Sequence, residues 1–144
     1  MCLDKDETRQ KNYSIINRNA QRILRLINQL MDIRKIDKGQ MTLMFSESDI
    51  IGLIDNVCGD FEQLMNIKNI SLDFHHDMES LNLWVDRSNF DKIIINVLSN
   101  AVKFTPENGN ISITVEKQDV AVITISDSGS KIDENEIERI FGRF

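Results

Sequence analysis

The sequence has few of the features that mark secreted, membrane-spanning or disulfide-linked proteins. Its two cysteines, Cys2 and Cys58, stand far apart with no pairing pattern, so we predict a reducing compartment and no disulfide framework. No stretch reaches the roughly 18 apolar residues of a membrane span, and the N-terminal "MCLDKDETRQ" lacks the apolar core of a signal peptide. These absences predict a cytoplasmic chain.

Positive charge is also scarce. Lys and Arg number 17 against 23 Asp and Glu, which gives a net charge of −6, and the chain carries no basic stripe. Both facts argue against nucleic acid as a partner, and an anionic ligand would need local donors and a metal ion. What the sequence does have is 41% hydrophobic and 28% charged residues in a length of 144, which suits one globular domain with a modest appendage.

The appendage lies at the N-terminus. Residues 5–37 contain no Gly or Pro, and Gly39 then provides a helix stop. Spacings of three and four residues alternate along a seam formed by Ile16, Asn19, Ile23, Leu26, Leu30 and Ile33. The pattern predicts one long coiled-coil-like helix that pairs with another helix, from the parent protein or from a second copy of the chain. An ordinary amphipathic helix lying on the globular part is the alternative.

The rest of the chain alternates between strand and helix patterns. In order we expect a strand over 41–49, a helix over 50–68 capped by Ser48 or Asp49, strands over 70–76 and 81–86, a helix over 88–104, a hairpin of strands over 110–117 and 120–127, and a short helix over 133–141. Both faces of the strand over 120–127 are apolar, which predicts a central position. This order predicts an α/β sandwich, with one mixed sheet and helices on one face.

The helix over 88–104 carries two different faces. The expected core face holds Phe90, Ile94, Val97, Leu98 and Ala101. The other face holds Asn96, Asn100, Lys103 and Phe104, at positions i, i+4, i+7 and i+8. Two amides and an ammonium on one face indicate that it points at a ligand, although such faces are often simply solvated.

A second candidate site is "SDSGSK", residues 126–131, at the end of an apolar strand. The Asp127 carboxylate would lie at the rim of the sheet, where it can accept a hydrogen bond from an exocyclic amine, and Gly129 would let a flat ligand approach. Opposite, Asn100 offers an oxygen for a divalent cation, Lys103 a charge for phosphate and Phe104 an aromatic wall. The two places together suggest a nucleotide site, although Asp-Ser-Gly is also an ordinary turn sequence.

Three motifs resemble those of sensor histidine kinases. "NVLSNAVKFT" resembles the N box of that family, "DSGSKI" the first glycine box and "IERIFGRF" the F box, in the expected order. The upstream "NAQRILRLINQLMDIRKIDKGQM" resembles the second helix of the dimerisation and histidine phosphotransfer domain. The resemblance implies that residues 1–39 are this helix and that residues 40–144 form a catalytic domain with the α/β sandwich fold shared by gyrase and a heat-shock chaperone.

The resemblance also implies a role for each residue of the site. Asn100 would bind Mg²⁺, with Asn96 beside the metal and the phosphates, while Lys103 would contact phosphate and Phe104 would line the nucleotide pocket. Asp127 would bind the adenine amino group.

Gly129 would let the adenine approach closely, and the implied cofactors are therefore ATP and Mg²⁺. The implied activity is transfer of the γ-phosphoryl of ATP to a histidine outside this chain, for relay to the receiver domain of a response regulator. The implied partners are the phosphotransfer helix of the same kinase and a second copy joined through the N-terminal helix. Whether the parent kinase is of the hybrid type or anchored in the inner membrane stays open.

Four departures from the family pattern bear on function. Asn96 stands where related hydrolases have a glutamate base, and an amide cannot take a proton at neutral pH, so phosphoryl transfer is favoured over hydrolysis. Lys131 replaces a second glycine, and the sequence stops at Phe144, where the lid should begin, so we expect a fragment. Nothing matches the phosphoacceptor motif, and we expect His75 and His76 to be surface residues. The alternatives are a scaffold module with a decayed nucleotide site and an ATP hydrolase of the same fold.

Overall fold

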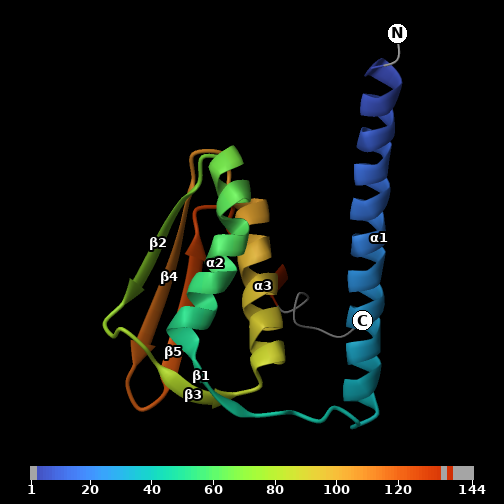
Figure 1. Cartoon of the computed structure of the whole chain (residues 1–144). Helices are drawn as coiled ribbons and strands as arrows, with labels where there is room; N and C mark the ends of the chain where they lie inside the picture. The colour runs from blue at the N-terminus through green and yellow to red at the C-terminus, as the bar shows by residue number, and fades with distance from the viewer. Residues whose placement is uncertain (1–2, 134–135, 138–144) are drawn as a thin grey trace. The chain divides into compact units, whose positions relative to one another are not determined.

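The computed structural model describes residues 3–133 and 136–137, in two compact units formed by Met1–Leu43 and Met44–Phe144. In the first unit, Leu3–Asp37 form helix α1, labelled in Figure 1. Gly39 ends it in the left-handed conformation (φ 62°), and its N–H donates to the Ile36 carbonyl at 3.0 Å. The expected stop at Gly39 is confirmed, because a glycine adopts this conformation without steric cost.

The apolar seam of α1 is exposed wherever the structure describes its side chains. All six positions of the expected seam are exposed, and so are Leu24, Ile27 and Met31. The exposed apolar surface is therefore wider than the seam alone. Isolated helices gain most of their stability from packing of such a surface, so α1 has a face suited to another helix.

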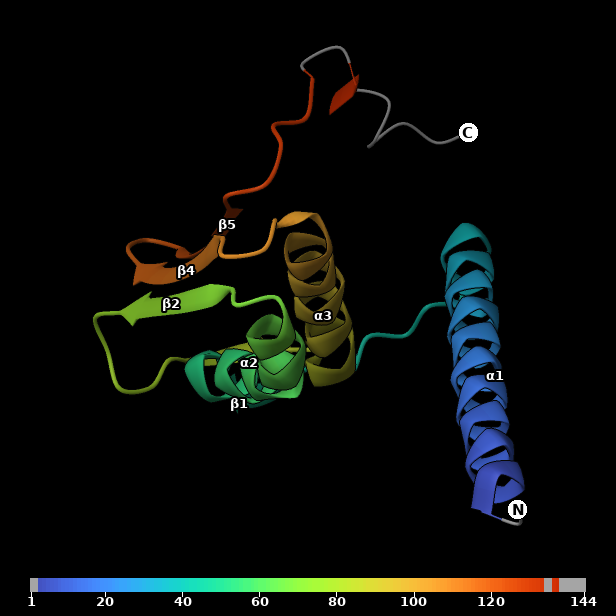
Figure 2. The same cartoon turned by 90° about the horizontal axis from the view of Figure 1, so that it is seen from above.

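The second unit is built from two layers. Its elements are β1 (Ser46–Asp49), α2 (Ile50–Ile67), β2 (Ser71–His76), β3 (Asn82–Val85), α3 (Arg87–Phe104), β4 (Asn110–Lys117) and β5 (Ala121–Asp127). Figures 1 and 2 show α2 and α3 side by side over one face of the sheet β2-β4-β5, in which β4 runs parallel to β2 and antiparallel to β5. This confirms the α/β sandwich with a mixed sheet.

Two details of the predicted sheet were wrong. The strand expected over 41–49 is only four residues long, and β1 and β3 form a separate antiparallel pair rather than part of one sheet. Among the described residues β5 pairs with β4 alone, so β4 and not β5 is central. The outward Val122 of β5 is accordingly 43% exposed, whereas the inward Ile123 and Ile125 pack on the core.

The core lies between the two layers. Ile111, Ile113 and Val115 alternate along β4 and are fully buried under Ile54 of α2 and Leu98 of α3. Every second side chain of the strand points toward the helices, and side chains three or four apart on each helix point toward the strand. The apolar contacts between these two sets hold the layers together.

The inward face of α3 differs from the prediction at one position. Val97 is 42% exposed, and Val102 takes its place in the core with 1% exposure. The buried stripe of α3 therefore runs through Leu98 and Val102, against α2 on one side and the sheet below, and Val97 joins the exposed face.

Aspartates begin both helices of the second unit. Asp49 caps α2 by accepting from the Ile51 N–H at 3.2 Å, and Asp86 caps α3 by accepting from Asn89 N–H at 3.0 Å. The other oxygen of Asp86 accepts from the Met44 N–H at 2.9 Å. The Met44 and Asn89 hydrogen bonds hold the pKa of Asp86 below its ordinary value. These caps fix where α3, the helix with the polar face, starts.

Two predictions fall partly outside the residues that the structure describes. The final helix expected over 133–141 falls outside the described residues except for 136–137, which are helical, and the motif resembling the F box falls outside them from residue 138 onward. Within the described ranges, no helix combines the length and the apolar character needed to cross a membrane.

Candidate functional site

The polar face of α3 is open. Asn96, Asn100, Lys103 and Phe104 are all exposed, and Phe104 keeps 60% of its surface accessible although it is aromatic. The Lys103 ammonium lies 4.7 Å from the centre of the Phe104 ring, a cation–π contact that holds both side chains at the end of the helix. An exposed aromatic ring beside a cation offers a stacking surface and a positive charge to one ligand.

The end of β5 lies against the same end of α3. A Cβ atom added to Gly129 would lie 2.7 Å from the Phe104 carbonyl oxygen and 2.5 Å from Asp127 Oδ1, so no larger residue fits this position without a shift. The Gly129 N–H donates to Asp127 Oδ1 at 2.8 Å, which orients the carboxylate and leaves its second oxygen able to accept from a ligand. The structure thus brings Asp127 and Gly129 to the backbone of Phe104.

Backbone and side-chain hydrogen bonds hold this end of β5 in place. The Ser128 N–H donates to the Asn110 carbonyl at 3.0 Å, and the Asn110 N–H donates to Ser128 Oγ at 2.9 Å. Asp127 therefore stands at the end of a paired strand rather than in a free loop.

Asn96 and Asn100 lie farther along the same face of α3. The eight helical steps from Asn96 to Phe104 span about 12 Å at the rise of an α-helix. The face can therefore contact an elongated ligand that places one group at Asp127 and Phe104 and another at Asn96.

No protein metal cage is present among the described residues, since no group of three His, Cys, Asp or Glu side chains could hold an ion there. A neutral amide oxygen is a suitable ligand for a hard divalent cation, but one or two amides do not bind it alone. The side chains at Asn96 and Asn100 therefore fit Mg²⁺ only if the ion arrives with the phosphates of a ligand.

The other residues singled out in the sequence lie away from this face or at its margin. His75 and His76 are exposed on β2, as expected, and His76 Nδ1 lies 2.7 Å from the Met78 carbonyl oxygen. Lys131 is exposed.

One residue of the site region was missed by the sequence analysis. Lys68 follows α2, and its ammonium hydrogen-bonds to backbone carbonyls at the end of α3. The available signal was a lysine at the last position of the predicted helix over 50–68, but its partners lie on another element and local sequence does not identify them.

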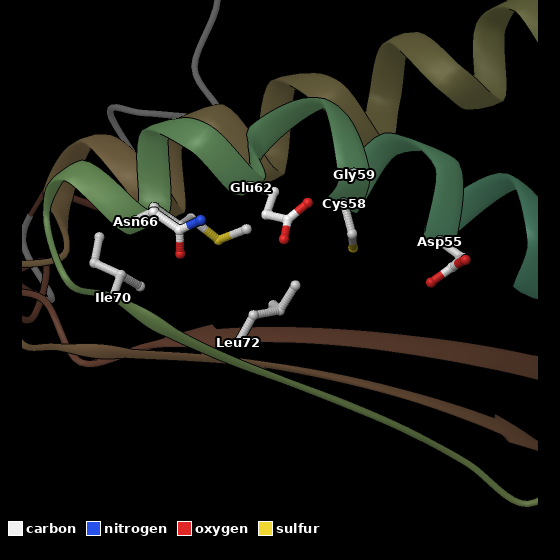
Figure 3. A pocket seen from close by; sticks show the side chains of 8 residues that line it. Asp55, Cys58, Gly59, Glu62, Asn66, Ile70 and Leu72 are labelled. Atoms are coloured by element: carbon white, nitrogen blue, oxygen red, sulfur yellow. The ribbon is translucent and has the colours of Figure 1, made fainter.

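A pocket of about 370 Å³ lies elsewhere, between α2 and β2. In Figure 3 Leu72 of β2 faces Cys58 and Glu62 of α2 across it. Burial, and secondarily the charge of Asp55, raises the pKa of the Cys58 thiol, so the thiol is poorly reactive. None of the residues that line this pocket belongs to the predicted nucleotide site.

Comparison with known proteins identifies the family to which this fold belongs. Residues 85–144 match the family described as histidine kinase-, DNA gyrase B- and HSP90-like ATPases. The sensor histidine kinase TmoS of Ectopseudomonas mendocina is 37% identical over 136 residues, which are 93% of this chain and 14% of TmoS. The chain spans about a tenth of the length of the curated relatives it matches.

Solved structures give the same result. The catalytic domain of the histidine kinase ThkA matches with a TM-score of 0.68 and 34% identity over 71% of this chain and 72% of that one. ThkA has also been solved in complex with the response regulator TrrA, with 30% identity over 85% of this chain and 37% of that one. Full-length ShkA in complex with AMPPNP shares the fold, with a TM-score of 0.79 and 23% identity over 93% of this chain and 29% of ShkA.

These matches define the class as an ATPase-type α/β sandwich. The chain belongs to the histidine kinase family and contains a catalytic domain of that kind. The resemblance identified from the three sequence motifs is thereby confirmed at the level of the family.

Proposed function

We propose that the exposed face of α3 and the end of β5 form a Mg·ATP site of a sensor histidine kinase. The observation that carries the proposal is the packing of Gly129 on the Phe104 carbonyl, because it sets Asp127 beside the aromatic and cationic end of α3. A carboxylate that accepts from an exocyclic amine, next to a ring for stacking, suits an adenine base.

The remaining roles follow along α3. With the base at Asp127, the phosphates extend toward Asn100 and Asn96, and Lys103 supplies positive charge to them. Asn100 provides an amide oxygen to a Mg²⁺ ion that the phosphates also bind, and the ion would neutralise charge during phosphoryl transfer. Asn96 contacts the same region without acting as a base.

The proposed reaction is transfer of the γ-phosphoryl of ATP to a histidine of a phosphotransfer domain. Asn96 argues against activation of water, because an amide cannot accept a proton at neutral pH. We propose α1 as the second helix of that domain and as the contact of a homodimer, with residues 1–39 and 40–144 as the two domains. The ThkA complex supports a response regulator as the later acceptor.

The site is tested by comparing how tightly it binds ATP and GTP, which carry different bases. We expect Asp127→Asn to weaken ATP binding about tenfold, because the amide can still accept from the Gly129 N–H but then presents an NH₂ group to the adenine amine. GTP, which carries a carbonyl at that position, should be affected much less. Calorimetric titration of both nucleotides with Mg²⁺ measures the difference.

Asp119→Asn in the hairpin is the matched control, since it makes the same change of charge on an exposed residue away from the site. It should leave both affinities unchanged. Equal ATP affinity in Asp127→Asn and the unaltered chain would contradict the proposed position of the base.

A further inference from the structure

The Lys68 ammonium binds the end of a different helix. Lys68 is the C-terminal cap residue of α2, and its Nζ donates to the carbonyls of Val102 at 2.7 Å, Thr105 at 2.5 Å and Lys103 at 3.4 Å. An ammonium has three donors, and here they meet three carbonyls at the end of α3.

These bonds occupy carbonyls that the helix itself leaves open. The last four carbonyls of an α-helix have no partner within it. The Ala101 carbonyl accepts from the N–H of Thr105 at 2.9 Å and from its Oγ1 at 2.6 Å. The carbonyls of Val102, Lys103 and Thr105 accept from Lys68. The remaining carbonyl in this stretch is that of Phe104, which lies against Gly129.

Lys68 is itself held firmly at this junction. Its carbonyl accepts from the Asn108 N–H at 3.0 Å, and Asn69 Nδ2 donates to Asn108 Oδ1 at 2.6 Å. Asn69 and Asn108 both adopt positive φ, 52° and 62°, a conformation that asparagine tolerates better than most residues. The half-buried Lys68 therefore starts from a fixed backbone and loses less entropy than a freely moving surface lysine.

We propose that Lys68 is a positioning residue for the nucleotide site. Lys68 holds the carbonyls on both sides of Phe104 and so fixes the backbone of Lys103 and Phe104. Gly129 packs against this backbone, and the position of Asp127 depends on that contact. The positive charge of Lys68 also offsets the partial negative charge at the C-terminus of α3, the end of the helix that carries Phe104. Lys68 acts through the backbone and does not touch the ligand, and this role rests on the nucleotide site proposed above.

The test compares Lys68→Met with Lys68→Arg and with Lys117→Met in the whole chain. Lys117 is exposed at the end of β4, so Lys117→Met makes the same change of charge away from the junction. The affinity for Mg·ATP is measured by calorimetry under conditions in which circular dichroism shows every variant to be folded. We expect Lys68→Met to weaken binding about tenfold, Lys68→Arg to retain most of the affinity and Lys117→Met to retain all of it.

A second readout is independent of nucleotide. Amide hydrogen exchange at Thr105 and Gly129, whose N–H groups are bonded within the junction, should become faster in Lys68→Met and stay unchanged in Lys117→Met. If folded Lys68→Met binds Mg·ATP with the same affinity as the unaltered chain, Lys68 stabilises the end of α3 without positioning the site, and the inference is overturned. If the unaltered chain binds no nucleotide, the proposed function fails, and unchanged exchange at Gly129 would refute the positioning role separately.

Discussion

Two asparagines one turn apart on α3 carry different parts of the proposed chemistry. Both present neutral amides on an exposed face, so neither can remove a proton from water at neutral pH. Asn100 is suited to bind a cation through its amide oxygen. The importance of Asn96 is that its amide cannot act as a base toward water. Within the proposed function, this pair of side chains is suited to phosphoryl transfer to another protein group rather than to hydrolysis.

Asn100→Asp tests the metal role at the scale of one residue, because it changes the charge of the site with little change of shape. Without Mg²⁺ the new carboxylate should repel the phosphates and weaken ATP binding about tenfold, and the dependence of affinity on Mg²⁺ should change with it. Titration of ATP with and without Mg²⁺ measures both effects.

Asn56→Asp is the matched control, since Asn56 is exposed on α2 and outside the site. It should leave the affinity and its Mg²⁺ dependence unchanged. An Asn100→Asp chain whose ATP affinity matches that of the unaltered chain under both conditions would exclude Asn100 as a metal ligand.

At the scale of elements, α1 is the helix whose apolar surface most needs a partner. The exposed Ile16, Ile23, Leu30 and their neighbours form a face that a second copy of the helix can cover. We predict that deletion of residues 1–37 abolishes self-association, as measured by sedimentation equilibrium. A shortened chain that still forms dimers would place the contact in the second unit instead.

A substitution in the seam gives a finer version of the same test. Leu30→Glu should weaken self-association because it places charges opposite one another in a paired seam, whereas Met44→Glu, an exposed apolar residue outside α1, should not. Equal effects of both changes would point to nonspecific association.

Most of the elements could be predicted because their signals are local. The period of 3.6 residues in α3 located its polar face, and the alternation in β4 located the inward Ile111 and Ile113. Positions that depend on contacts between distant segments could not be predicted in this way. Val97 was assigned to the core because local sequence does not determine how α3 is rotated about its axis against α2 and the sheet.

The same limit applies to pairing and to polar contacts over long separations. The apolar alternation of β5 suggested a central strand, but a place in the sheet is set by which strands pair, and β4 is the strand with two neighbours among the described residues. The bonds from Lys68 join residues at least 34 positions apart, so no local pattern contains them. The residues of the candidate site could be named from local sequence because they lie in two short motifs, and their roles stay predictions.

At the scale of the second unit, three distant segments meet at one junction. The end of α2 at Lys68, the end of α3 at Phe104 and the end of β5 at Gly129 are linked by hydrogen bonds and close packing. The junction joins both layers of the sandwich, so the orientation of Asp127 depends on the fold as a whole. The pocket at Cys58 lies between α2 and β2 and shares no lining residue with this junction.

Amide chemical-shift mapping during titration with Mg·ATP tests the central claim most directly. We predict saturable shifts along Asn96–Phe104 and Asp127–Gly129, with little change around Cys58 and Leu72 in the pocket of Figure 3. Shifts confined to that pocket, or no saturable shift at millimolar Mg·ATP, would contradict it.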